Sequence, residues 1–290
     1  MISPRARADC HVHVVGDPAR YPQVATRPYL AGPAPLAELR RQGAAHGISR
    51  FVIAQASFYG SDNTLLLESL DALSGNGRGV AVVDPATAQE EQLSMLHRRG
   101  IRGLRINLYS RQVGQDFAPL DRVFAAQADL ARAMGWHVEV IAALGMVLEN
   151  VALIANAGVW VVLDHYGLVG RLTPESAAGR QFLDLLRRGH VWVKLSAPYR
   201  LSGNPLDTRP DPAWLSAILE AAPDRCVWGS DWPHTPPPEQ HLGADSPAPY
   251  RAIDYGTLVD HFLSALPAAD LAERIFIRNP ARLYDFPDPG

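Results

Sequence analysis

The sequence has little cysteine, no long apolar run and almost no net charge, and each scarcity narrows what the protein can be. Two cysteines in 290 residues are too few for a disulfide framework, so we expect a reducing compartment. The chain contains no apolar run of 18 residues, and its first fifteen residues lack a signal-peptide core, which predicts a cytoplasmic protein with no membrane partner. A net charge of −3 does not favour nucleic acid as a partner.

Hydrophobic residues, at 47% of the chain, form eight short β-rich runs separated by helical patterns. The runs cover residues 8–15, 50–56, 79–84, 103–108, 136–142, 159–165, 191–196 and 225–231. Helical patterns such as 35–47, 89–100, 120–135 and 174–189 end at a glycine, as helices often do. Strand–helix alternation predicts right-handed βαβ units and a parallel sheet. Eight repeats without a break in composition predict one domain, residues 1–290, folded as a (β/α)8 TIM barrel.

Three long irregular segments each follow a predicted strand. They cover residues 16–35, 197–212 and 233–250. In an α/β barrel the loops after the strands build the active site, and long loops are usually functional. We therefore expect the site at the carboxyl ends of the strands.

Ionisable residues stand at the ends of three predicted strands. His11 and His13 are two apart on the first strand, so both side chains should point into the barrel mouth, whereas alternation turns Cys10 toward the helices. His165 ends the sixth strand and Asp231 the eighth. Burying such groups without a purpose is costly, so their convergence predicts a catalytic centre.

These residues carry a family resemblance. An HxH pair on strand 1, a histidine on strand 6 and an aspartate on strand 8 resemble the amidohydrolase superfamily, and the terminal IFIRNPARLYDF resembles its amidohydrolase 2 branch. The runs DCHVHVVGDPARYPQVATRPYL, QASFYGSDN and RINLYSR are similar to the 2-pyrone-4,6-dicarboxylate lactonases and their relatives. The resemblance implies that Asp231 activates water as a general base. It also implies that the three histidines polarise the scissile carbonyl, and both roles suit lactone hydrolysis.

Histidine and aspartate at strand ends can also bind zinc. Binuclear members of the superfamily use a lysine on strand 4 and a histidine on strand 5. Strand 4 has no lysine here, and His137 lies at the start of strand 5, with Glu139 placed to orient a neighbour. We therefore favour no cofactor. The alternative is one divalent metal, such as zinc, on His11, His13 and Asp231.

Several polar residues after the strands predict an anionic substrate. Arginine holds carboxylates in a bidentate fork, and the predicted substrate-binding residues are Arg105, Arg111, Arg200, Tyr29, Ser57, Tyr59 and Asn63. Ser57 and Asn63 could equally be a turn residue and a helix start.

One position departs from the dicarboxylate lactonases, which carry an arginine three residues after the strand-6 histidine. Leu168 stands there, and Arg171 would have to reach back to replace it. The missing arginine favours a substrate with fewer or differently placed anionic groups than the dicarboxylate. Examples are a muconolactone-type, sulfonated or sugar-acid lactone.

The leading hypothesis is a hydrolase that opens a small anionic lactone, working as a monomer or homodimer. The alternatives are a mononuclear zinc amidohydrolase or decarboxylase of the same branch, a lactone isomerase, and a non-catalytic sugar-acid binder. The complete set of three histidines and Asp231 argues against the binder, which needs no base.

Overall fold

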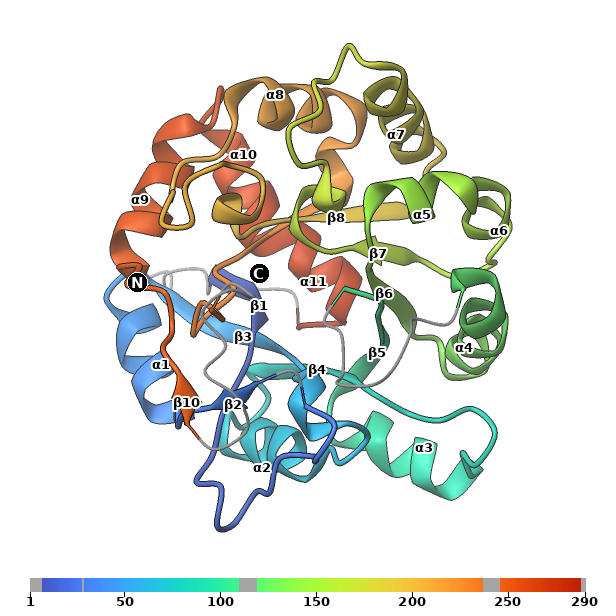
Figure 1. Ribbon diagram of the computed structural model, residues 1–290, viewed down its shortest axis with the longest axis vertical. Coiled ribbons are helices and arrows are strands. Elements are labelled where there is room, and N and C mark those ends of the chain that lie inside the picture. Colours follow the sequence, from blue (N-terminus) through green and yellow to red (C-terminus); the bar gives the residue numbers. More distant parts are fainter. Residues whose placement is uncertain (1–6, 28, 110–118, 237–245, 288–290) are drawn as a thin grey trace.

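A ring of eight parallel strands forms the centre of the molecule (Figure 1). The structure is a computed structural model that describes residues 7–27, 29–109, 119–236 and 246–287. The strands of the ring are β1 (Arg7–Val12), β3 (Ile48–Ala54), β4 (Gly77–Ala81), β5 (Ile101–Asn107), β6 (His137–Ile141), β7 (Val161–Leu163), β8 (Val191–Ser196) and β9 (Cys226–Gly229). Each overlaps one of the predicted apolar runs.

The first and last strands close the ring. Val12 and Trp232 form a parallel bridge. The His13 amide donates to the Trp232 carbonyl at 2.8 Å, and the Asp231 amide donates to the His11 carbonyl at 2.9 Å. The predicted (β/α)8 TIM barrel is therefore confirmed.

Helices surround the strands on the outside of the ring (Figure 1). They are α1 (Leu36–Ala44), α2 (Thr64–Ala72), α3 (Glu90–Arg98), α4 (Leu120–Met134), α5 (Leu144–Glu149), α6 (Val151–Ala155), α7 (Ala177–Arg187), α8 (Pro212–Ala221), α9 (Tyr255–Ala265) and α10 (Asp270–Glu273). The glycines after α1, α3, α4 and α7 have φ between 66° and 97°, the left-handed conformation that ends a helix.

The C-terminal segment closes the amino-terminal end of the barrel. The π-helical turn η6 (Arg274–Arg278) leads into α11 (Asn279–Tyr284). Leu283, Tyr284 and Phe286 pack with side chains from six strands, among them Val52 and Val162. Because one cluster holds residues from strands all round the ring, it must fill the barrel interior.

Strand β1 contains a bulge that overturns one prediction. Asp9 pairs with Phe51 and Val12 with Ile53, so three steps along β1 match two along β3. The extra residue breaks the alternation of side chains. Cys10 therefore belongs to the cluster inside the barrel, although we expected it to face the helices.

The loops at the carboxyl ends of the strands carry short elements of their own. β2 (Leu30–Ala31) pairs with β10 (Pro247–Ala248), joining the loops that follow the first and last strands of the ring. The 3₁₀ turns η1 (Ser57–Tyr59), η2 (His165–Leu168) and η3 (Pro198–Arg200) follow β3, β7 and β8, and η4 (Pro223–Arg225) precedes β9. Within the described residues, no helix has the length and apolarity needed to cross a bilayer.

Candidate active site

Asp231 and the three predicted histidines meet at the carboxyl ends of the strands. Asp231 Oδ1 lies 3.6 Å from His11 Nε2, 3.5 Å from His13 Nε2 and 3.9 Å from His165 Nε2. All four side chains are buried. The fold therefore brings together one carboxylate oxygen and three imidazole nitrogens from the residues that the sequence indicated.

The backbone after three neighbouring strands adopts a conformation that side chains disfavour. His165 follows β7 with φ 51°, Ala197 follows β8 with φ 52°, and Asp231 follows β9 with φ 61°. A left-handed conformation of a residue other than glycine costs about 1–3 kcal/mol and persists where the surroundings enforce it. Its occurrence after three strands at the same rim of the barrel supports this rim as the candidate functional site.

The second carboxylate oxygen of Asp231 is held by two side chains from η3. Tyr199 donates its hydroxyl to Oδ2 at 2.6 Å, and Arg200 donates Nη2 at 2.8 Å and Nε at 3.2 Å. Burial alone would raise the pKa of Asp231, but the Arg200 guanidinium, followed by His165, holds it well below the ordinary value. Asp231 is therefore a carboxylate at neutral pH, with Oδ1 facing the histidines.

His11 and His165 are neutral, and the outer nitrogens of His13 and His165 are engaged. Burial lowers the pKa of His11 and of His165 well below the ordinary value. His13 Nδ1 lies 2.8 Å from the Ala54 carbonyl oxygen, and His165 Nδ1 lies 2.8 Å from Ser196 Oγ. These contacts fix both rings so that Nε2 points at Asp231.

A buried group behind His11 escaped the sequence analysis. Lys194 of β8 hydrogen-bonds to Glu139 and lies 3.0 Å from His11 Nδ1 and 3.6 Å from Asp164 Oδ1. Glu139, expected to orient a neighbour, orients this lysine. The sequence nevertheless marks this residue. Lys194 is the only lysine in the sequence and is a charged residue within the apolar run VWVKLS, just as Asp164 and Asp231 are charged residues within apolar runs.

Two of the predicted arginines reach the site and make different contacts. Arg105 of β5 is buried, donates Nη1 to the Gln55 carbonyl at 2.5 Å and places Nη2 3.9 Å from Asp164 Oδ2. Arg200 donates hydrogen bonds to Asp231 and to Thr235 Oγ1, each at 2.8 Å. Arg111 lies outside the described residues.

The remaining predicted substrate residues divide into one near Asp231 and three that hold loops. Tyr29 is buried, and the charges of Arg200 and Asp231 both act on its hydroxyl. The Tyr59 hydroxyl accepts the Gly16 amide at 3.1 Å. The Asn63 amide bridges Ser61 and Val82, and Ser57 begins η1. Asn63 occupies the N-cap position of α2, but its side chain does not cap the helix.

Arg171, the candidate replacement for the arginine missing at Leu168, lies on the surface. Leu168 lies in η2 with φ 51°. Arg171 is exposed, and its guanidinium lies next to Gly203 in the loop after η3.

Two groups of side chains among the described residues have the spacing of a metal site. They are His11, His13 and Asp231, and His11, Asp164 and His165. In both, the ligand atoms lie within 4.8 Å of one another. Either group offers enough ligands for one zinc ion, provided that the facing nitrogen of His11 carries no hydrogen.

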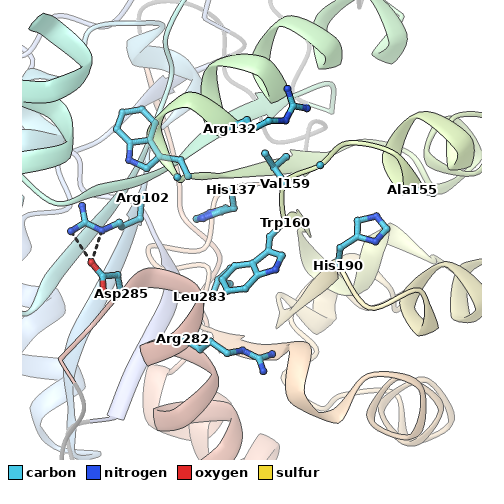
Figure 2. A pocket seen from close by; sticks show the side chains of 13 residues that line it. Arg102, Arg132, His137, Ala155, Val159, Trp160, His190, Arg282, Leu283 and Asp285 are labelled. Carbon is cyan, nitrogen blue, oxygen red and sulfur yellow. Dashed lines mark hydrogen bonds and ion pairs between the residues drawn. The ribbon is translucent and has the colours of Figure 1, made fainter. Parts of the chain in front are cut away.

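A separate cavity lies at the opposite end of the barrel. Its volume is about 540 Å³, and its lining includes His137, at the start of β6, together with Arg102, Trp160 and Arg282. Figure 2 shows these side chains. Arg102 is paired with Asp285 and Arg282 with the Asp224 carbonyl. His137 thus lies at the amino-terminal end, as its place in the sequence indicated, and takes no part in the Asp231 site.

The barrel and its buried carboxylate–histidine centre define an amidohydrolase-type (β/α)8 protein. The amidohydrolase family (Amidohydro_2) matches residues 8–286. Because that match spans nearly the whole chain, the protein belongs to the amidohydrolase family.

Three curated relatives match this chain over nearly its full length. The chain is 31% identical to a 2-pyrone-4,6-dicarboxylate hydrolase of Comamonas testosteroni, covering 97% of this chain and 90% of the relative. It is 29% identical to a 4-sulfomuconolactone hydrolase of Rhizobium radiobacter, with 97% and 90% covered. It is also 29% identical to a D-galactarolactone isomerase of Agrobacterium fabrum, with 97% and 91% covered.

A solved structure of the same kind superposes closely. The protein from Pseudomonas putida described as a 2-pyrone-4,6-dicarboxylic acid hydrolase has a TM-score of 0.79 and 28% identity, with 98% of this chain and 99% of that chain covered.

Proposed function

We propose that the protein hydrolyses a small anionic lactone, with Asp231 as the general base. The observation that carries the proposal is the environment of Asp231: Oδ2 is held by Tyr199 and Arg200, which leaves Oδ1 facing the three histidines. A carboxyl group that is ionised at neutral pH can accept a proton from water in the transition state. Two relatives named as lactone hydrolases support this reaction class.

The histidines supply the electrostatic part of the reaction. Lactone hydrolysis places negative charge on the carbonyl oxygen when water attacks, and donors aimed at that oxygen lower the barrier. An imidazole N–H of the cluster is suited to this task because the ring is buried and already oriented. Asp231 takes the water proton and returns it to the ring oxygen as the ester bond breaks.

The charge of the site favours an acid-bearing lactone. Arg105 lies buried beside Asp164, and Arg111 follows the same strand in the sequence. Because Arg200 is committed to Asp231, Arg105 and Arg111 are the arginines that we assign to the substrate anion. With Leu168 in place of an arginine, we propose fewer anionic groups than a dicarboxylate, as in a sulfonated or muconolactone-type substrate.

A panel of acidic lactones tests the proposal. Purified protein is mixed with pyrone dicarboxylate, sulfomuconolactone, muconolactone and sugar-acid lactones, and ring opening is followed by proton release. We expect turnover of at least one acidic lactone and none by Asp231→Asn. Absence of turnover across all of these lactones would contradict the proposal.

A lactone isomerase is the second candidate, because one relative carries that name. Isomerisation moves the ester to another hydroxyl without net addition of water. Product analysis by NMR in H₂¹⁸O separates the two reactions, since only hydrolysis incorporates ¹⁸O into the carboxylate product.

A further inference from the structure

The only lysine of the chain is buried at the centre of the barrel. Lys194 has no exposed surface. Its three polar neighbours are Glu139 Oε2, to which it hydrogen-bonds, His11 Nδ1 at 3.0 Å and Asp164 Oδ1 at 3.6 Å. An ammonium group has three hydrogens to donate and no lone pair. The three neighbours therefore match its three hydrogens, and the carboxylates compensate the buried charge.

Lys194 decides which nitrogen of His11 carries the hydrogen. A neutral imidazole has one N–H and one bare nitrogen. Because an ammonium group can only donate, the contact at 3.0 Å requires Nδ1 to be the bare nitrogen. The hydrogen is then on Nε2, which lies 3.6 Å from Asp231 Oδ1.

His13 is oriented by a different contact, which places a hydrogen on its Nδ1. Its Nδ1 lies 2.8 Å from the Ala54 carbonyl oxygen, which can only accept. Nδ1 of His13 therefore holds a hydrogen, and Nε2 lies 3.5 Å from the same oxygen of Asp231.

We propose that Lys194, held in place by Glu139, is a positioning residue that locks His11 in the Nε2–H tautomer. The lock makes His11 Nε2 a hydrogen-bond donor toward the reacting carbonyl. It also prevents His11 from binding a metal, since Nε2 carries the hydrogen and the bare nitrogen, Nδ1, is occupied by the Lys194 ammonium. The role toward the carbonyl rests on the proposed lactonase function. The tautomer and its effect on metal binding do not.

Removing the lysine should create a zinc site. Without the ammonium, His11 Nδ1–H can donate to Asp164 Oδ1, which lies 3.3 Å away. That is the carboxylate–histidine–metal arrangement found in zinc proteins. His11, His13 and Asp231 would then present bare ligand atoms within 4.8 Å of one another.

The first test uses the native protein and needs no folded variant. Labelling with ¹⁵N-lysine gives a single side-chain NMR signal, because the chain has one lysine. Labelling with ¹⁵N-histidine reports the protonated nitrogen of each ring, with His11 assigned by the signals that disappear in His11→Gln. We expect a charged ammonium and a His11 ring protonated at Nε2. A neutral amine, or a hydrogen on His11 Nδ1, would overturn the proposal.

The second test measures zinc affinity by calorimetry. The variant is Lys194→Met combined with Glu139→Gln, which removes both members of the pair and leaves neither charge unpaired. Circular dichroism checks that it is folded. A carboxylate that orients a histidine ligand, as Asp164 would orient His11 in this variant, is worth about 10–100-fold in metal affinity. We expect zinc to bind the double variant more tightly than the native protein by that factor, and addition of His11→Gln to abolish the gain. Equal affinity of the native protein and a folded double variant would overturn the proposal. Neither test uses lactone turnover, so a failed substrate screen leaves both results interpretable.

Discussion

At the scale of single residues, Asp231 is the side chain on which the proposed chemistry depends. Asp231→Asn should lower kcat by about 10²–10⁴-fold, because an amide cannot take a proton from water. The two side chains are nearly isosteric, and the measurement is steady-state kinetics on the lactone found by the substrate screen. Thermal unfolding of the variant controls for the lost pairing with Arg200. A folded variant that keeps more than a tenth of the native kcat contradicts the assignment.

The arginines permit a test of substrate charge. Arg105→Met and Arg111→Met should each lower kcat/KM for an acidic lactone by about 10- to 150-fold, since a hydrogen bond to a charged group contributes about 1.5–3 kcal/mol. A neutral lactone of the same ring should lose far less. Measured kcat/KM values on the two substrates give the comparison.

Arg200→Met is the matched control for this test. Its guanidinium contacts Asp231 at 2.8 Å, so its loss should affect charged and neutral lactones alike. If Arg105→Met shows the same equal loss on both substrates, the case for an anion pocket at Arg105 fails.

At the scale of elements, Arg78 of β4 fastens α11 and its tail to the barrel, together with Arg50 of β3 and Arg102 of β5. Arg78 donates Nε to the Tyr284 carbonyl at 3.0 Å and Nη2 to the Asp285 carbonyl at 2.6 Å. Arg78→Met should lower the free energy of unfolding by about 2–4 kcal/mol, because buried charge-assisted hydrogen bonds are lost. The kcat should be unchanged, since Arg78 lies at the end of the barrel opposite Asp231.

The same substitution at an exposed arginine is the control. Arg41 pairs with Glu38 at 3.7 Å on the surface of α1, and Arg41→Met should change the unfolding free energy by less than about 0.5 kcal/mol. Denaturant titration measures both variants. A similar stability for Arg78→Met and Arg41→Met would show that Arg78 does not hold the C-terminal segment.

At the scale of the whole molecule, buried neutral histidines make stability depend on pH. Burial lowers the pKa of His137 and of His234 to about 4, and that of His11 and His165 further. Between pH 6.5 and 4 the unfolded chain takes up protons that the native protein does not. The free energy of unfolding should therefore fall as pH falls through this window.

Two buried acids, Asp9 and Glu139, work in the opposite direction, because burial raises the pKa of each. Burial raises the pKa of Asp9 to about 6, so the native protein binds a proton there before the unfolded chain does. Asp9 thus contributes stability as pH falls from about 6 toward its ordinary value of 3.8. The four histidines outnumber these two acids.

His137 offers a way to measure one share of the pH dependence. A pKa lowered from 6.5 to about 4 corresponds to about 3 kcal/mol. His137→Leu should reduce the loss of stability between pH 6.5 and 4 by up to that amount, as measured by denaturant unfolding at several pH values. An unchanged pH slope would mean that His137 is not buried in its neutral form.

The sequence by itself determined the barrel and the members of the candidate catalytic centre. Eight apolar runs and the glycines that end four helices are local signals, and they predicted strands and helices in the right order. His11, His13, His165 and Asp231 were identifiable because each is a charged or polar residue at the end of an apolar strand. Parallel strands in a closed ring have to deliver such residues to the same rim.

The tertiary structure alone decided what these residues contact. Lys194 and His11 are 183 positions apart, and only closure of the ring brings them within 3.0 Å. Arg200 could have met a substrate anion, but the turn η3 directs it to Asp231. Cys10 faces the barrel interior because one extra residue in β1 interrupts the alternation of side chains between the two faces of the strand. The sequence pattern does not reveal this bulge. Partners across a barrel depend on register and on the direction of turns, and neither is encoded in the pattern of a single strand.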